Sequence, residues 1–177
     1  MIRITGGKNR SRLLETPNTT LTKPTMDKVR AAVFSALGDK VLDTKVLDLF
    51  SGSGSYGFEA LSRGAKGVTF VDKNIDATKC IAKNASNLKE NNISIIKDDV
   101  LSFLKNSNEK FDIVFVDPPY KLEVYEDIVK TLITNQLVSS NAIIVLESEK
   151  ELNIDKSLFK EVRFYKYGLA KVYILRK

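Results

Sequence analysis

Short apolar runs alternate with longer amphipathic segments along the chain from residue 45 onward. A short continuous apolar run indicates a strand buried on both faces, and apolar residues recurring every three or four positions indicate a helix. Their alternation predicts a parallel sheet flanked by helices. The expected strands are residues 45–49, 67–71, 93–97, 111–116 and 142–147, and the expected helices are residues 56–62, 75–88, 99–105 and 124–135.

The last part of the chain departs from this rhythm. Residues 158–166 and 169–175 are both strand-like and are separated by Tyr167-Gly168. So short a connection suits an antiparallel hairpin and is too short for a crossover. We therefore expect a Rossmann-like α/β fold whose mostly parallel, seven-stranded sheet ends in an antiparallel hairpin.

The segment before the first strand predicts a helix over residues 25–37, because Val29, Val33 and Leu37 recur at helical spacing and Gly38 follows as a stop. Residues 1–22 are expected to form a small basic extension of strands and loops. Residues 23–177 are then one domain, which suits a chain of 177 residues that is 43% hydrophobic.

Composition excludes several classes of protein. The single cysteine, Cys80, cannot form an internal disulfide, and its place in a predicted amphipathic helix indicates a packed side chain. No apolar stretch approaches the roughly 18 residues that span a bilayer, and the first residues lack the apolar segment of a secretory signal. We therefore expect a cytoplasmic protein. With no histidine and one cysteine, we expect no metal site.

The net charge of +6 is concentrated at the two ends of the chain. Residues 1–30 carry seven basic and two acidic side chains, and residues 160–177 carry six basic and one acidic. Basic ends on an acidic body suit an enzyme whose ends contact a polyanion, because phosphate neutralisation supplies most sequence-independent affinity for nucleic acid. The candidate RNA-binding residues are Arg3, Lys8, Arg10 and Arg12, with a solvated tail as the alternative.

A glycine-rich loop between the first strand and its helix predicts a nucleoside-binding site. Gly52, Gly54 and Gly57 follow the G-x-G-x-x-G spacing, which allows a tight turn and a close approach of ligand to backbone. Asp72 ends the second strand, 20 residues after Gly52, where a carboxylate can accept hydrogen bonds from ribose hydroxyls.

Asp48, just before the loop, favours S-adenosylmethionine over a nicotinamide dinucleotide, because a carboxylate there repels a pyrophosphate and attracts an ammonium or sulfonium group. Helix capping or a solvated strand end is the alternative for Asp48 and Asp98. The candidate cofactor-binding residues are Pro24, Thr25, Asp48, Phe50, Gly52, Ser53, Gly54, Asp72, Lys73, Asp98, Asp99, Val100 and Asp117.

The tetrapeptide Asp117-Pro118-Pro119-Tyr120 follows the fourth strand and supplies the candidate catalytic residues. The exocyclic amine of a base is a poor nucleophile, because its lone pair is delocalised into the ring. The Asp117 carboxylate and the Pro118 carbonyl can each accept an amine hydrogen and so turn the lone pair towards the methyl donor. The two prolines restrict the turn, and Tyr120 offers a ring on which an extruded base can stack.

These motifs resemble the RsmD-like methyltransferases, which modify the N2 amine of a guanine in 16S ribosomal RNA of the small subunit. The matching stretches span nearly the whole chain: residues 3–8 with Arg10 and Arg12, residues 23–25 and 27–30, residues 48–64, residues 117–120, and Tyr167-Gly168. The family usually has arginine where Lys23 stands and alanine where Ser51 stands.

The resemblance implies a guanine-N2 methyltransferase that uses S-adenosylmethionine, with Asp72 on the ribose, residues 98–100 at the adenine and residues 24–25 closing over the cofactor. It also implies that the basic extension contacts ribosomal RNA within the small ribosomal subunit. We expect the protein to be a monomer. Three other interpretations stay open: an N6-adenine or other amino-methyltransferase acting on DNA or RNA, a nicotinamide-dependent oxidoreductase, and an RNA-binding module without catalysis.

Overall fold

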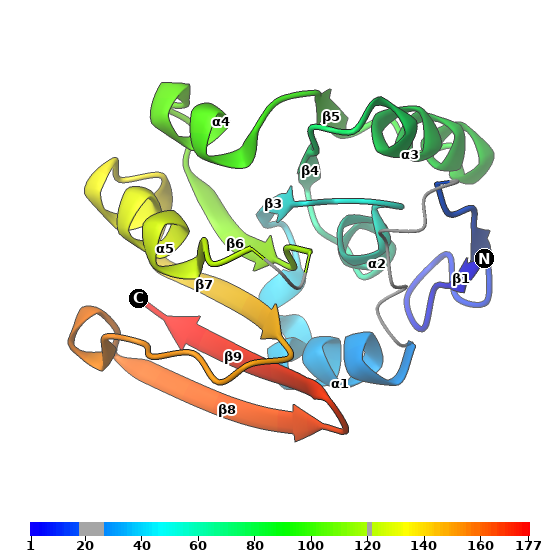
Figure 1. Ribbon diagram of the computed structural model, residues 1–177. Coiled ribbons are helices and arrows are strands. Elements are labelled where there is room, and N and C mark those ends of the chain that lie inside the picture. Colours follow the sequence, from blue (N-terminus) through cyan, green and yellow to red (C-terminus); the bar gives the residue numbers. More distant parts are fainter. Residues whose placement is uncertain (18–26, 120–121) are drawn as a thin grey trace.

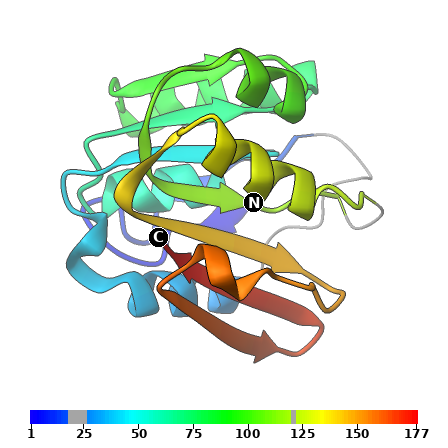
Figure 2. The ribbon, with the colours of Figure 1, turned by 90° about the vertical axis from the view of Figure 1, so that its left-hand side faces the viewer.

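The computed structural model describes residues 1–17, 27–119 and 122–177. Its main sheet has seven strands in the order β5-β4-β3-β6-β7-β9-β8, with β5 and β8 at opposite edges (Figures 1 and 2). The strands are β3 (Lys45–Leu49), β4 (Gly67–Val71), β5 (Ile93–Ile96), β6 (Phe111–Val116), β7 (Val138–Ser148), β8 (Glu161–Tyr167) and β9 (Ala170–Arg176). The first five are parallel, and β9 and β8 complete the sheet antiparallel, which confirms the predicted fold class.

Helices cover both faces of the sheet. One face packs against α1 (Asp27–Leu37), α2 (Ser55–Ser62) and α3 (Ile75–Leu88), and the other against α4 (Val100–Asn106) and α5 (Tyr125–Thr134) (Figure 1). Alternate residues of β6 enter the two layers: Phe115 packs on the first face, and Val114 and Val116 pack on the second. Burial on both faces explains the continuous apolar run of this central strand.

The element boundaries differ from prediction where a polar side chain decides them. The helix predicted over residues 99–105 begins at Val100, because Asp99 is its N-cap and accepts hydrogen bonds from the amides of Leu101 and Ser102. The hairpin begins at Glu161, because residues 156–158 form a short 3-10 turn capped by Asp155. Such caps compete locally with strand and helix, so apolar periodicity alone does not locate them.

A further boundary moved, and another was confirmed. β7 begins four residues earlier than predicted, because buried Val138 pairs with Phe111 of β6 ahead of the polar residues 139–141 and a register shift. Gly38 ends α1 with a positive φ of 56°, as predicted, and opens a 3-10 turn, η1 (Gly38–Val41). No helix among the described residues is long and apolar enough to cross a membrane.

The N-terminal extension forms a small antiparallel hairpin of β1 (Ile2–Arg3) and β2 (Leu13–Leu14). Ile2, Ile4 and Leu14 are buried in the same apolar cluster as α1 and α2. The basic residues of the extension are therefore carried on a segment that shares the core of the sheet domain.

Candidate functional site

The glycine loop and the Asp117 motif lie at the same edge of the sheet. β3 and β6 are neighbours and run parallel, with Leu49 opposite Val116. The loop begins directly after Leu49 and the motif directly after Val116, so both begin at the carboxyl ends of adjacent strands. In doubly wound sheets this edge is where ligands bind.

The glycine loop is built from left-handed backbone conformations. Phe50, Gly52 and Gly54 have φ values of 56°, 55° and 78°. A Cβ at Gly54 would lie 2.7 Å from the ring of Phe58, so glycine is required for space as well as for φ. Phe50 is the unusual member, because a bulky side chain at positive φ costs free energy and is found mainly at functional sites.

Ser51 ties the loop to the neighbouring strand. Its Oγ donates to the carbonyl of Asp48 at 2.5 Å and accepts from the amide of Val71 at 2.9 Å. The hydroxyl therefore bridges the ends of β3 and β4. The departure from alanine at this position adds two hydrogen bonds beneath the loop.

Asp48 is buried, with 3% of its surface exposed, and its Oδ2 accepts the amide of Gly57 at 2.9 Å in the first turn of α2. The capping role considered for this residue is thus present in the structure. Burial raises the pKa of Asp48 to about 8; the Gly57 hydrogen bond opposes the shift and the charge of Asp72 adds to it. With this pKa the Asp48 side chain is mostly protonated near pH 7, and a cationic partner bound beside it would favour the ionised form.

Asp72 also supports the loop. Its Oδ2 accepts the amide of Gly52 at 2.9 Å, and its Oδ1 accepts the amide of Asn74 at 2.8 Å. A carboxylate oxygen can accept more than one hydrogen bond, so both oxygens retain capacity for hydroxyl donors. Lys73 follows and is exposed.

The turn after β5 places its polar groups near the start of α4. Asp99 is exposed and caps this helix, whereas Val100 is buried in the core. Asp98 is half-buried, and its Oδ1 accepts the amide of Asp99 at 2.7 Å.

The three described residues of the acceptor motif differ in burial: Asp117 is half-buried, Pro118 is buried and Pro119 is exposed. Asp117 lies close enough to Tyr56 for its charge to raise the pKa of that phenol, after the larger effects of burial and of Glu147. Because Tyr56 belongs to the first turn of α2, this proximity connects the acceptor motif to the glycine-loop helix. Tyr120, Pro24 and Thr25 lie outside the described residues.

Sequence reasoning missed a buried polar pair beside this motif. The hydroxyl of Tyr56 donates to Oε2 of Glu147 at 2.7 Å, and the two residues are only 3% and 8% exposed. The Tyr56 ring stacks on Phe115, with the ring centroids 4.6 Å apart. One signal in the sequence could have identified Glu147: it lies near the end of an apolar strand, as Asp48 and Asp117 do.

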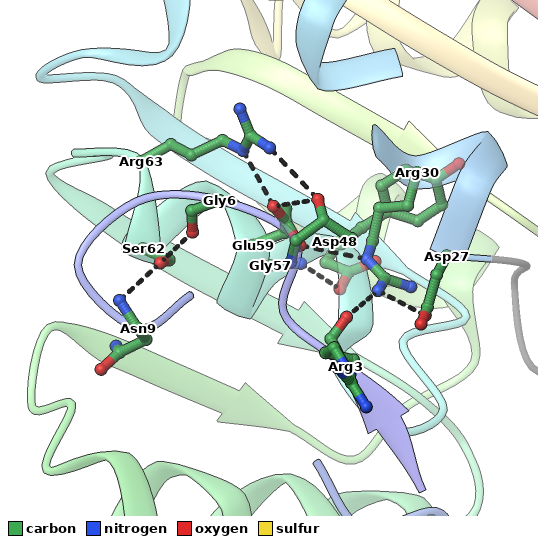
Figure 3. Close-up of polar contacts among 12 residues, drawn as sticks. Arg3, Gly6, Asn9, Asp27, Arg30, Asp48, Gly57, Glu59, Ser62 and Arg63 are labelled. Carbon is green, nitrogen blue, oxygen red and sulfur yellow. Dashed lines mark hydrogen bonds and ion pairs between the residues drawn. The ribbon is translucent and has the colours of Figure 1, made fainter. Parts of the chain in front are cut away.

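A second buried network joins the basic hairpin to α1 and α2 (Figure 3). Glu59, fully buried, accepts from both the amide and the hydroxyl of Thr5, from Nε of Arg30 at 3.3 Å and from Nε of Arg63 at 2.8 Å. Arg30 is also fully buried and donates to the carbonyl of Arg3 and to Asp27. These contacts fix the hairpin against the helix that follows the glycine loop.

The glycine pair of the hairpin crosses the end of α2 at very close range. A Cβ at Gly7 would lie 1.8 Å from the carbonyl oxygen of Ser62, and one at Gly6 would meet the guanidinium of Arg63. The Ser62 hydroxyl donates to the carbonyl of Gly6 and accepts from the amide of Asn9 (Figure 3). The glycines therefore serve the packing of the hairpin.

The four candidate RNA-binding side chains are all exposed on this hairpin, but two are engaged. Lys8 forms an ion pair with Glu90 at 2.9 Å, and Arg12 donates to the carbonyl of Asn87 at 2.8 Å. Within the described part of the chain, Arg3 and Arg10 have no ion pair. Among the described residues, the charge of Lys8 is offset by an ion pair, whereas Arg12 is held by a neutral carbonyl and keeps its net charge.

Comparison with known proteins gives consistent matches. A family model described as Conserved hypothetical protein 95 matches residues 2–176. Ribosomal RNA small subunit methyltransferase D of Escherichia coli (strain K12) is 37% identical over 150 residues, covering 85% of this chain and 76% of the relative. Putative rRNA methyltransferase YlbH of Bacillus subtilis (strain 168) is 30% identical over 182 residues and covers 99% of both chains.

Solved structures show the same similarity. The putative methyltransferase yhhF from Escherichia coli superimposes with a TM-score of 0.89 at 33% identity, covering 99% of this chain and 97% of that chain. A Thermus thermophilus 16S rRNA N2 methyltransferase in complex with AdoMet and guanosine gives a TM-score of 0.74 at 20% identity, covering 90% of this chain and 44% of that one. The second likeness concerns the fold alone.

Proposed function

Since this chain belongs to the family of ribosomal RNA small subunit methyltransferase D, we propose that it transfers a methyl group from S-adenosylmethionine to the exocyclic N2 amine of a guanine in 16S ribosomal RNA. The nitrogen gains the methyl group and loses one proton, and the donor leaves as S-adenosylhomocysteine. The observation that carries the proposal is the meeting of the glycine loop and the Asp117 motif at the carboxyl ends of β3 and β6.

The residues of the loop fit a cationic nucleoside. Asp48 offers a buried carboxylate to the ammonium or sulfonium region, and Asp72 offers two oxygens to the ribose hydroxyls. The left-handed turn from Phe50 to Gly54 brings backbone close to the ligand. When bound, the group supplies an electrophilic methyl; residues 24–25, Lys73 and residues 98–100 complete its binding site.

The acceptor motif prepares the amine. Asp117 and the carbonyl of Pro118 accept the two amine hydrogens, which favours the pyramidal nitrogen whose lone pair faces the methyl donor. Asp117 then holds the departing proton. Pro119 restricts the turn, and Tyr120 supports the extruded base by stacking.

The basic hairpin, within the extension of residues 1–22, supplies the contact with RNA phosphates through Arg3, Lys8, Arg10 and Arg12. All four side chains are exposed, and the Glu59 network fixes the hairpin to the domain of residues 23–177. The protein acts as a monomer in the cytoplasm.

The test is methyl transfer from labelled S-adenosylmethionine to small ribosomal subunits that lack the modification, with the labelled nucleotide mapped by mass spectrometry. One labelled guanine is expected. Duplex DNA assayed in parallel tests the adenine alternative, and cofactor binding measured against a nicotinamide dinucleotide tests the oxidoreductase alternative. Bound cofactor without label in any RNA would refute the proposal.

Asp117→Ala should bind the cofactor nearly as wild type does but lose roughly 100- to 1,000-fold in kcat, because its acceptor acts on the amine. Asp127→Ala removes an exposed aspartate of α5 and is the matched control, expected to keep wild-type turnover. Near wild-type turnover by Asp117→Ala would refute the role given to this residue.

A further inference from the structure

Glu147 lies at the level of the acceptor motif. β7 runs parallel to β6 with Leu146 opposite Val116, so Glu147 and Asp117 follow at the same height on neighbouring strands. Side chains alternate along a strand, and the preceding alternate residues, Val145 and Phe115, pack in the same cluster. The two carboxylates therefore project from the same face of the sheet.

One oxygen of this carboxylate is engaged and the other is available. Oε2 accepts the Tyr56 hydroxyl at 2.7 Å, and within the described ranges no donor is placed on Oε1. Among the described residues, Nε of Arg176 is the side-chain nitrogen or oxygen that is fully buried and lacks a hydrogen-bond partner. Oε1 of Glu147 is not in that class, so it remains accessible to a ligand. Glu147 thus offers a hydrogen-bond acceptor in a setting that excludes most water.

An acceptor at this position discriminates among bases that carry an exocyclic amine. In guanine the ring nitrogen beside the amine, N1, carries a hydrogen and donates. In adenine the corresponding N1, and in cytosine N3, carries a lone pair and accepts. A carboxylate oxygen attracts the first arrangement and repels the other two, and buried sites built for a donor reject analogues that lack it.

We infer that Glu147 accepts the N1–H of the target guanine through Oε1 and is the residue that selects guanine over other amino bases. This assignment rests on the proposed function. Tyr56 acts as a positioning residue: its hydroxyl holds Oε2, and its stacked ring fixes the direction of that hydroxyl.

Two groups around Glu147 favour its ionised form against the effect of burial. Burial raises the pKa of Glu147, whereas the hydrogen bond from Tyr56 and the charge of Arg30 both oppose that shift. Arg30 is itself fully buried in α1, so its charge is little screened by water. Arg30 also pairs with Glu59 and Asp27, and Asp117 lies close enough to Tyr56 to add a further negative charge.

The experiment compares two acceptors that differ at the ring nitrogen. Small subunits are reconstituted with 16S RNA containing either guanine or 2,6-diaminopurine at the methylated position; both carry a 2-amine, but diaminopurine has a lone pair at N1. Wild-type enzyme should prefer guanine by roughly 100-fold in kcat/KM. Glu147→Gln should reduce that preference at least tenfold, because its amide can turn an N–H towards the base while Tyr56 holds the carbonyl oxygen.

Control variants separate selection from structural support. Tyr56→Phe and Glu147→Asp both disturb the pair but keep a carboxylate, so they should lower activity on both acceptors and leave the ratio unchanged. Glu151→Gln removes an exposed charge nearby in sequence and should change neither value. Cofactor affinity and thermal unfolding measured for each variant report any general loss of structure.

An unchanged guanine-to-diaminopurine ratio in Glu147→Gln, with wild-type methylation intact, would overturn the assignment of Glu147 alone. A change of ratio in Tyr56→Phe equal to that in Glu147→Gln would also overturn it, because the effect would then be structural. Failure of wild-type enzyme to methylate guanine would instead refute the proposed function, and the assignment with it.

Discussion

Removal of the Glu59 carboxylate should strongly destabilise the protein. Glu59 and Arg30 are both fully buried, and Glu59 also accepts hydrogen bonds from Thr5 and Arg63. In Glu59→Ala, the amide of Thr5 and the Nε of fully buried Arg30 lose their acceptor. Breaking a buried ion pair by removing one partner costs about 3–5 kcal/mol, and the half-exposed Asp27 that Arg30 retains does not replace a fully buried partner.

That loss is large compared with the roughly 5–15 kcal/mol that stabilises a typical domain. At this chain length, 1 kcal/mol corresponds to about 2–4 °C in Tm, so Tm should fall by roughly 6–20 °C. Urea unfolding followed by circular dichroism gives the free energy directly. The control is Glu109→Ala, which breaks the half-exposed pair with Lys45 and should cost under about 1 kcal/mol.

Hydrogen exchange can locate the damage. The hairpin amides of Ile4, Lys8 and Ser11 donate to backbone carbonyls at 2.8–2.9 Å and should exchange faster in Glu59→Ala than in wild type. Amides of the central strand β6 should keep a larger share of their protection. A Glu59→Ala protein within about 1 kcal/mol of wild type, with the hairpin still protected, would refute the role assigned to this network.

Three further outcomes are expected. Gly57→Ala should cost about 1–3 kcal/mol in urea unfolding despite its better helix propensity, because the new Cβ would lie 2.2 Å from the Phe70 ring; an equal or higher midpoint would contradict this. Because the folded pKa of Asp48 is about 8, well above its ordinary value of 3.8, its stabilising contribution is present at low pH and is lost as pH rises to about 8. The unfolding free energy of wild type should therefore fall relative to Asp48→Asn between pH 4 and about 8, and a constant difference would refute the shift. Arg10→Ala should reduce the salt dependence of RNA binding by about 0.7–0.9 in log–log slope, and an unchanged slope would place Arg10 away from phosphate.

Local patterns were sufficient for the centre of the fold. The apolar run of residues 111–116 correctly predicted β6, and Asp117 was recognised because it follows that strand. The carboxyl ends of parallel strands meet at one edge, so Asp48, Asp72 and Asp117 could be placed together without coordinates. Boundaries were less predictable, because Asp99 and Asp155 cap their turns through local hydrogen bonds that leave no periodic pattern.

The buried pairs depend on contacts between distant segments. Tyr56 and Glu147 are 91 residues apart in sequence, and Thr5 and Glu59 are 54 apart. Each residue by itself is unremarkable in sequence: a tyrosine in a glycine-loop helix, or a glutamate on a helix. Only the fold shows that each is buried against a polar partner. Burial increases the contribution of such a hydrogen bond to stability, because the local dielectric constant is low.

Arg30 connects stability to the electrostatics of the candidate site. It binds Glu59 and the carbonyl of Arg3, which anchors the basic hairpin, and its charge opposes the burial-driven rise in the pKa of Glu147 and of Tyr56. Asp48, Asp117 and Glu147 project from the sheet face that α1 covers, and the buried charge of Arg30 there favours the ionised form of Glu147. The same arginine therefore holds the proposed RNA-contacting segment in place and favours the ionised acceptor beside Asp117.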